Sequence, residues 1–134
     1  LDVSGDLLSL ARQRLALHGV ADRATFMAAS AHDIPLPDCS IDAVMGIAIL
    51  HHLDLDLAAR EILRVLKPGG LAIFQEPVRN SRLLKAIRAA IPYRDDEVSD
   101  YERPLTDEEL RRFARGFRDY QSRAFSLPFI NLAQ

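Results

Sequence analysis

Residues 41–49 read IDAVMGIAI, and every residue after Asp42 in this run is apolar or glycine. A strand with one face in water alternates polar and apolar residues, whereas a continuous apolar run is typical of a strand covered on both faces of a parallel sheet. The run therefore predicts a buried strand in the middle of a sheet.

A helix is predicted directly after this strand, because Asp54 or Asp56 can cap its first turn. Its apolar positions recur at helical spacing: Leu55, Ala58, Ile62 and Val65. The Pro-Gly-Gly sequence at 68–70 ends the helix, and residues 71–74 form a second buried strand. Alternating strands and helices favour parallel strands joined by right-handed crossovers, so we predict an α/β fold.

The N-terminal part predicts one more helix and one more strand. Ser4 can cap a helix over residues 4–17, which Gly19 ends. One apolar face of this helix consists of Leu8, Ala11 and Leu15. The short apolar run at 24–28 is predicted to be a strand, and the proline-containing residues 30–40 a loop.

The C-terminal part is less regular. A helix is predicted from residue 80 or 81 to residue 91, followed by a charged, exposed excursion over residues 94–103. Thr106 and Glu109 have the spacing of a capping box, which predicts the start of another helix. Residues 120–127 are a weaker strand candidate.

Composition narrows the possible function classes. The 134 residues are 49% hydrophobic and 27% charged, which fits one soluble globular domain. The net charge of −2 gives no nucleic-acid signature. Cys39 is the only cysteine, which excludes an intramolecular disulfide and suits a reducing cytosol. The longest apolar run, residues 43–50, is too short to span a bilayer, so we expect a cytoplasmic protein.

Four stretches carry a resemblance to a known family. They are LDVS at 1–4, IPLPDCSIDAV at 34–44, ILHHL at 49–53 and REILRVLKPGG at 60–70. In this order and spacing the chain resembles the class I S-adenosylmethionine (SAM)-dependent methyltransferases, in particular the small-molecule type. The resemblance extends from Leu1 to about Pro77.

The resemblance implies a doubly wound, mostly parallel sheet with SAM across the carboxyl ends of its strands. We expect one partial domain over 1–134, with a cofactor-binding core at 1–77, a variable substrate-side excursion at 78–105, and a C-terminal helix and strand at 106–134. The family's central first strand and glycine-rich turn should precede Leu1. We therefore expect an N-terminally truncated fragment that, as an isolated chain, binds SAM poorly or not at all.

The resemblance also implies a set of cofactor-binding positions, which are Asp2, Val3, Ser30, Ala31, Gly46 and Ile47. The Asp2 carboxylate would accept hydrogen bonds from both ribose hydroxyls, and Val3 would pack on the adenine. Ser30 and Ala31 stand where many relatives have Asp-Ala, so the adenine contact there should be neutral and weaker. Gly46 would permit close approach of the cofactor to the backbone.

Four further residues are candidates for chemistry on the acceptor. His51 follows a strand end and is the expected general base. Glu76, Tyr93 and Tyr101 are expected to contact the substrate. We expect no metal site, because the adjacent His51 and His52 point to different sides and no set of ligands accompanies them.

The function implied by the resemblance is methyl transfer from SAM to a small molecule by direct displacement. Neither a nucleic acid nor a membrane is an expected partner. Two other classes remain open: a nicotinamide-dependent oxidoreductase, in which an acid after the second strand also binds ribose, and a non-catalytic, methyltransferase-like binding domain.

Overall fold

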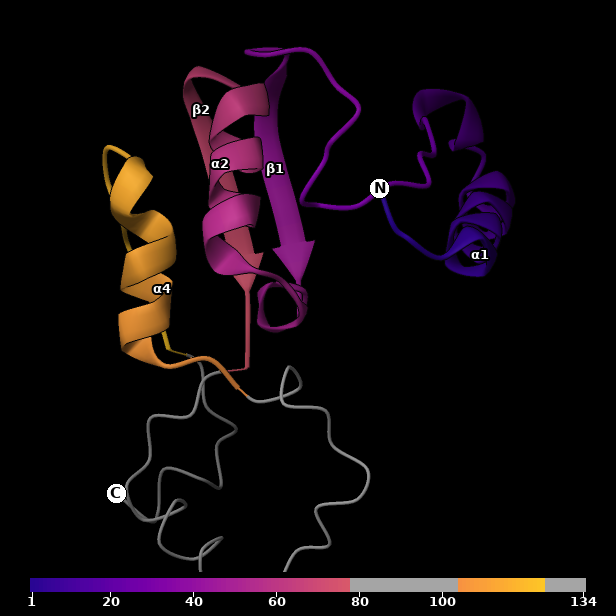
Figure 1. Cartoon of the computed structure of the whole chain (residues 1–134). Helices are drawn as coiled ribbons and strands as arrows, with labels where there is room; N and C mark the ends of the chain where they lie inside the picture. The colour runs from indigo at the N-terminus through magenta and orange to yellow at the C-terminus, as the bar shows by residue number, and fades with distance from the viewer. Residues whose placement is uncertain (78–103, 125–134) are drawn as a thin grey trace, which may run out of the picture.

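The computed structural model describes residues 1–77 and 104–124. Its centre is a strand–helix–strand unit made of β1 (Ile41–Ile47), α2 (Leu55–Val65) and β2 (Leu66–Gln75). The two strands are parallel, and α2 crosses from one to the other (Figure 1). The predicted α/β class and the parallel pairing are therefore confirmed.

The strand register contains one irregularity. Ile41 pairs with Leu66, whereas Ala43 pairs with Leu71, so the chain between Leu66 and Leu71 bulges away from the ladder. Gly69 lies in this bulge with φ of 80°, a backbone conformation that favours glycine. The helix ends at Val65, before the Pro-Gly-Gly sequence that was predicted to end it, and β2 begins at Leu66 and passes through the bulge.

Local sequence determines both ends of α2. The Asp54 carboxylate accepts hydrogen bonds from the backbone N–H groups of Asp56 and Leu57, each at 3.0 Å. The Leu57 N–H bond is the main cause that holds the pKa of the Asp54 carboxyl below its usual value. The helix buries one stripe, made of Ala58, Ile62 and Val65. The predicted helix and its predicted apolar face are confirmed.

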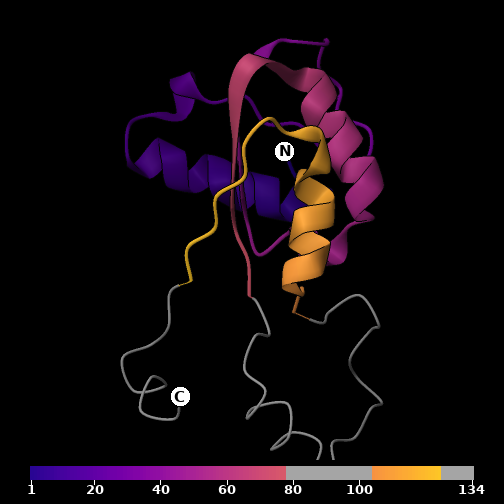
Figure 2. The same cartoon turned by 90° about the vertical axis from the view of Figure 1, so that its left-hand side faces the viewer.

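Helix α4 (Asp107–Phe113) packs beside α2. The predicted capping box is present, because Thr106 accepts from the Glu109 backbone N–H and the Glu109 side chain accepts from that of Thr106. Phe113 contacts Phe74 of β2 edge to face, with ring centroids 5.3 Å apart. Helix α4 thereby closes the core on the side of the sheet that α2 covers (Figure 2).

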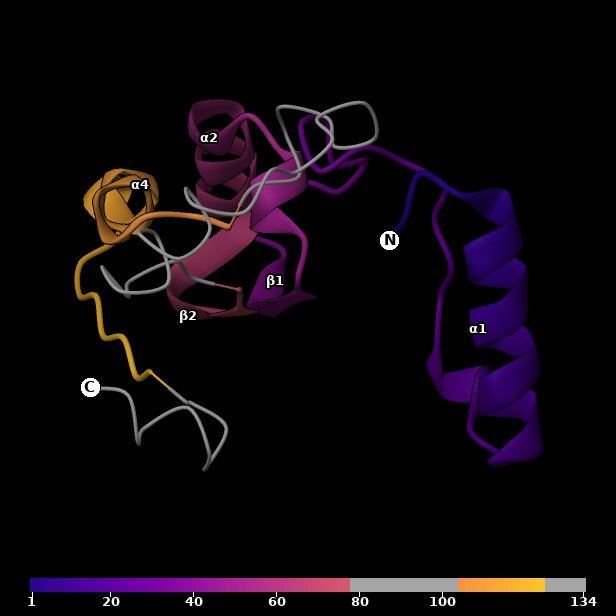
Figure 3. The ribbon, with the colours of Figure 1, turned by 90° about the horizontal axis from the view of Figure 1, so that it is seen from below.

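The sheet is covered on one face in the described part of the chain. Figure 3 shows α2 and α4 on the same side of β1 and β2. The opposite face leaves four large apolar side chains exposed, namely Met45, Ile47, Leu71 and Ile73. Within residues 1–77 and 104–124, β1 also pairs along one edge only, with β2. The prediction of a central strand covered on both faces is therefore wrong for these residues, because no described element supplies the second cover.

The N-terminal part forms a separate substructure. Helix α1 (Gly5–Leu17) begins at Ser4, whose hydroxyl accepts from the Leu7 N–H, so the predicted cap is confirmed. The helix buries no residue and lies away from the sheet (Figure 1). The run at 24–28 forms a single parallel bridge between Ala28 and Asp2 rather than the predicted strand. Backbone pairing to one short neighbour is too little to sustain a ladder.

A clamp of two side chains from α2 fastens the loop at 34–38. The Arg64 guanidinium donates to the carbonyl oxygens of Leu36 (2.9 Å) and Ile34 (2.8 Å) and to Asp38. The Glu61 carboxylate accepts from Arg64 and, at 2.9 Å, from the Ile34 backbone N–H. Two of the motifs in the resemblance, the loop sequence and REILR, are therefore joined physically.

Because of this clamp, we expect the free energy of unfolding to depend on pH. The Arg64 guanidinium, followed by the Ile34 N–H, lowers the pKa of Glu61 from 4.5 to about 2. A carboxyl with a depressed pKa in the folded state stabilises the protein above its unfolded value and loses that contribution as pH falls through the folded value. We expect Glu61→Gln to flatten the fall in the free energy of unfolding between about pH 5 and pH 2, as urea titrations would measure. An exposed acid outside the clamp, replaced as Asp119→Asn, should keep the wild-type slope; an unchanged slope in Glu61→Gln would contradict the clamp.

Several expected features lie outside the described residues, among them the helix ending at residue 91, the charged excursion, Tyr93 and Tyr101. Residues 120–124 are described and irregular, so the strand predicted at 120–127 is absent from this part. No helix among the described residues has the length and apolar character needed to cross a membrane.

Candidate active site

The carboxyl ends of β1 and β2 bring four of the predicted site residues together. Gly46 and Ile47 end β1, Glu76 directly follows β2, and His51 lies in the short 3-10 helix η2 (Leu50–His52) between β1 and α2. The Ala48 N–H donates to the Gln75 carbonyl at 2.8 Å, which extends the ladder by one bond beyond the strands. In open parallel sheets this edge is where ligands bind.

His51 and Glu76 form a pair at this edge, and most of both side chains is covered. His51 Nδ1 lies 2.8 Å from Glu76 Oε2, and the two side chains are 11% and 3% exposed. The other carboxylate oxygen, Oε1, accepts from the backbone N–H groups of Ile49 (2.8 Å) and Leu50 (2.9 Å). Both oxygens of Glu76 therefore contact groups of the protein, and little of the side chain is open to a substrate.

The neighbouring imidazole is in a different environment. The rings of His51 and His52 are 4.0 Å apart with a tilt of 41°, and His52 is exposed. In residues 1–77 and 104–124, no three His, Cys, Asp or Glu side chains come together as a set of metal ligands. Of the two histidines, His51 is thus the one held by a charged partner.

The space around Gly46 is filled from within the protein. A Cβ atom at this position would lie 2.6 Å from two atoms of the Phe74 ring and 2.7 Å from Ile49. The side-chain direction of Gly46 therefore faces the core covered by α2, whereas Ile47 lies on the bare face and is 66% exposed. The glycine is required by packing against Phe74 and Ile49, a reason that the sequence pattern did not reveal; its contact with a cofactor remains a prediction.

A second group of predicted residues lies at the bridge between the N-terminus and residue 28. The Asp2 N–H donates to the Met27 carbonyl, and the Ala29 N–H donates to the Asp2 carbonyl at 3.0 Å. Asp2 Oδ1 accepts from the Ser4 N–H at 2.8 Å, and in the described part of the chain Oδ2 has no hydrogen-bond partner. Val3 is 77% exposed beside it. The half-buried carboxylate thus fits a ligand that offers hydroxyl donors.

Ser30 and Ala31 follow the same bridge. The Ser30 hydroxyl accepts from the His32 backbone N–H at 3.1 Å, so one of its lone pairs serves the local turn. His32 Nε2 accepts from the Asp54 N–H at 3.0 Å, which ties this loop to the start of α2. Sequence reasoning missed His32; its position two residues after Ser30 was the available signal. The structure therefore joins the loop that follows the Asp2 bridge to the start of α2 through one imidazole.

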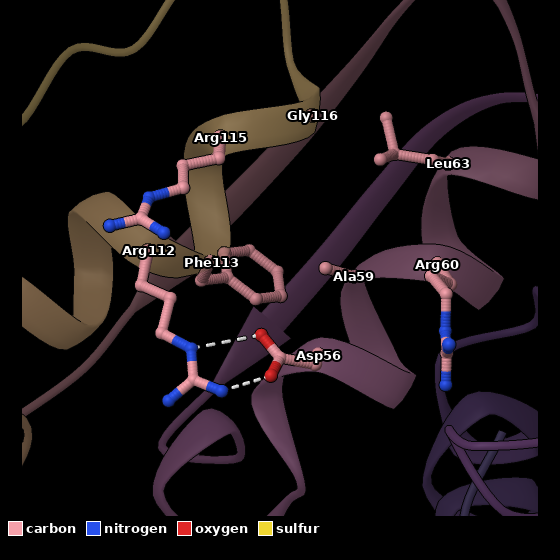
Figure 4. Close-up of a pocket in the computed structure, with 8 residues that line it drawn as sticks. All are labelled: Asp56, Ala59, Arg60, Leu63, Arg112, Phe113, Arg115 and Gly116. Carbon is pink, nitrogen blue, oxygen red and sulfur yellow. Dashed lines mark hydrogen bonds and ion pairs between the residues drawn. The ribbon is translucent and has the colours of Figure 1, made fainter.

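An open pocket of about 390 Å³ lies elsewhere, between α2 and the segment from α4 to Gly116. Figure 4 shows Arg112 paired with Asp56 at one side, while Arg60 projects from α2 away from Arg115. The hydrogen bond to Asp56 is the main cause that raises the pKa of Arg112 above its usual value. None of the predicted site residues lines this pocket.

Comparison with known proteins gives a family match. A protein-family model described as "Methyltransferase domain" matches residues 1–74, which are more than half of the chain. The ubiquinone/menaquinone biosynthesis C-methyltransferase UbiE of Brucella anthropi is 42% identical over 73 residues, which are 52% of this chain and 27% of that relative. This chain therefore spans little more than a quarter of the relative's length.

Two solved structures have a similar fold. A crystal structure of the cyclase SpnF matches with a TM-score of 0.63 and 29% identity, over 85% of this chain and 40% of SpnF. A SAM dependent methyltransferase from Aquifex aeolicus matches with a TM-score of 0.58 and 20% identity, over 85% of this chain and 54% of that protein. At that lower identity the likeness concerns the fold alone.

Proposed function

Since this chain belongs to the methyltransferase-domain family, we propose that the intact protein transfers a methyl group from SAM to a small-molecule acceptor by direct displacement. The observation that carries the proposal is the placement of Asp2. Its carboxylate is anchored through Oδ1 to the Ser4 N–H, while its backbone is fixed by the bridge to residue 28. A carboxylate held in this way is a suitable acceptor for the paired hydroxyls of a ribose.

The role of the protein is mainly to position the reactants. SAM, when bound, supplies a methyl group on a positively charged sulfur that is a good leaving group. Asp2 would orient the ribose, and Val3 would cover the adenine with its exposed side chain. His51 would accept a proton from the acceptor at Nε2, because Nδ1 is engaged by Glu76. Holding the acceptor in line with the methyl group then provides most of the rate enhancement.

The acceptor class is the finer part of the proposal. The name of the Brucella relative supports a carbon acceptor in ubiquinone or menaquinone biosynthesis. Methylation at carbon releases a proton, which a base such as His51 would accept. The family match ends at residue 74, before the excursion that we expect to shape the substrate site. The match therefore does not specify the acceptor, and other small molecules should be assayed beside quinone precursors.

A second candidate function rests on SpnF. That protein is a cyclase with a similar fold, which supports a methyltransferase-like domain without methyl transfer as the alternative. The family match favours methyl transfer over the nicotinamide-dependent oxidoreductase. The two surviving candidates differ in one measurable product, S-adenosylhomocysteine.

The test combines binding and turnover in the intact protein. Calorimetry should detect SAM binding, and release of S-adenosylhomocysteine should depend on an added quinone precursor. We expect His51→Ala to lower turnover by about 100-fold without changing SAM affinity, as loss of a general base would. The matched control is His18→Ala, which removes an exposed imidazole at the end of α1. SAM binding without release of S-adenosylhomocysteine would favour the second candidate, and absence of SAM binding would refute the proposed methyl transfer.

A further inference from the structure

We infer that Glu76 is a positioning residue that sets the tautomer of His51 and holds the turn that carries it, rather than the substrate-binding residue expected from the sequence. This inference rests on the proposed function, in which His51 acts on the acceptor. It concerns the pair of His51 and Glu76 at the carboxyl ends of β1 and β2, where the side chain of Glu76 is 3% exposed.

The first argument is the number of donors around one carboxylate. Oε1 accepts from two successive backbone N–H groups, those of Ile49 and Leu50, and Oε2 lies 2.8 Å from His51 Nδ1. A buried carboxylate is costly unless protein donors replace water, and these three contacts replace it. Three of the roughly four acceptor positions of the carboxylate are therefore used within the protein, and at 3% exposure its side chain offers little surface to a substrate.

The second argument is the tautomer of His51. An ionised carboxylate has only acceptors, so the hydrogen shared with Oε2 must reside on Nδ1 of the imidazole. A neutral imidazole with its hydrogen on Nδ1 has its lone pair on Nε2. The 2.8 Å contact therefore selects the ring nitrogen that is able to accept a proton. A carboxylate that orients a histidine in this way is a recurrent arrangement in active sites.

The third argument is the rigidity of both partners. Glu76 directly follows β2, and the bond from the Ala48 N–H to the Gln75 carbonyl fixes the end of that strand against the end of β1. Leu50, which is buried in the core, anchors the turn on the other side of His51. Both ends of the pair are thus tied to the sheet and its core, which is what positioning requires.

A change of one atom tests the tautomer directly. In Glu76→Gln, the side-chain oxygen can still accept from Ile49 and Leu50, but the amide nitrogen then donates toward Nδ1 of His51. We expect the hydrogen of His51 to move from Nδ1 to Nε2, which 15N-detected NMR of the labelled intact protein would show as exchanged protonated and unprotonated ring nitrogens. Turnover should fall by about 10- to 100-fold, with SAM affinity and KM within about twofold of wild type.

Two further variants separate positioning from folding. Asp42→Asn removes a carboxylate that accepts from Lys67 at the opposite end of β1, and it should change neither the His51 tautomer nor turnover. Glu76→Asp retains a carboxylate and should keep the hydrogen on Nδ1 and restore part of the turnover. If Glu76→Gln does not fold, the tautomer in wild type and in Glu76→Asp decides the question.

The outcomes are distinguishable from those of the proposed function. A hydrogen on Nε2 of His51 in the wild type, or an unchanged tautomer or full turnover in a folded Glu76→Gln variant, would overturn the inference. A wild-type protein that neither binds SAM nor releases S-adenosylhomocysteine would refute the proposed function, while the NMR result would still decide whether Glu76 orients His51.

Discussion

Replacement of Asp2 with alanine is expected to weaken SAM binding by at least about 100-fold in the intact protein, because two hydrogen bonds to a charged group are lost at about 1.5 kcal/mol or more each. The carboxylate is half-buried and fixed by its bond to the Ser4 N–H. In the alanine variant, water at this position would therefore be a poor substitute for the carboxylate as an acceptor for the ribose hydroxyls. Isothermal titration calorimetry of the variant and the wild type measures the difference.

Two variants calibrate this result. Asp2→Asn keeps one acceptor oxygen and should bind SAM with intermediate affinity. Asp6→Ala removes an exposed acid from the first turn of α1 and should leave the affinity within about twofold, because surface charges act weakly at a distance. Wild-type SAM affinity in Asp2→Ala would contradict the ribose-binding role of Asp2, on which the proposed function rests.

Truncation of Phe113 to alanine is expected to lower the free energy of unfolding by about 3–5 kcal/mol, the usual cost of removing a buried phenylalanine ring. Phe113 is 6% exposed and connects α4 to the sheet through its edge-to-face contact with Phe74. Figure 4 shows its ring on the side of α4 that faces Ala59 of α2. Urea denaturation of the intact protein, followed by circular dichroism, measures the change.

The matched control is the neighbouring ring of Phe117, whose centroid lies 5.8 Å from that of Phe113. Phe117 is half-buried, so Phe117→Ala should cost clearly less than Phe113→Ala. Phe113→Leu fills part of the space and should be intermediate. A loss below about 1 kcal/mol in Phe113→Ala would mean that α4 contributes little to the core.

The parts of the fold that were predicted correctly depend on neighbours in the sequence. Ser4, Asp54 and Thr106 each accept a hydrogen bond from a backbone N–H two or three residues later, so the start of a helix is encoded within one turn. The exit of the second strand before Glu76 was also predicted from the apolar run, with the strand ending at residue 74, one residue before its observed end at Gln75. Such features need no knowledge of the tertiary structure.

The contents of the candidate site were predicted less completely. The sequence indicated that His51 and Glu76 lie at strand ends, but not that the two side chains face each other across 25 positions of sequence. Likewise, nothing local connects Arg64 to the carbonyl oxygens of Ile34 and Leu36. These contacts depend on the crossover of α2, which brings distant segments together.

The exposed face of β1 and β2 is the clearest difference between the prediction from sequence and the tertiary structure. The hydrophobic sequence of β1 showed that this strand is suited to burial, since the side chains of Met45 and Ile47 are both apolar. What covers a face, however, depends on the elements that pack on it, and in the described residues α2 and α4 share the other face.

Sequence alone determined the alternation of strands and helices, the helix caps and the family, because these reside in short motifs and in periodicity. Only the tertiary structure decided that the Glu76 carboxylate contacts His51, that Gly46 makes room for Phe74, and that His32 ties its loop to α2. The physical reason is that hydrogen bonding and packing depend on distances in space, which a chain sets only when its crossovers and register are complete.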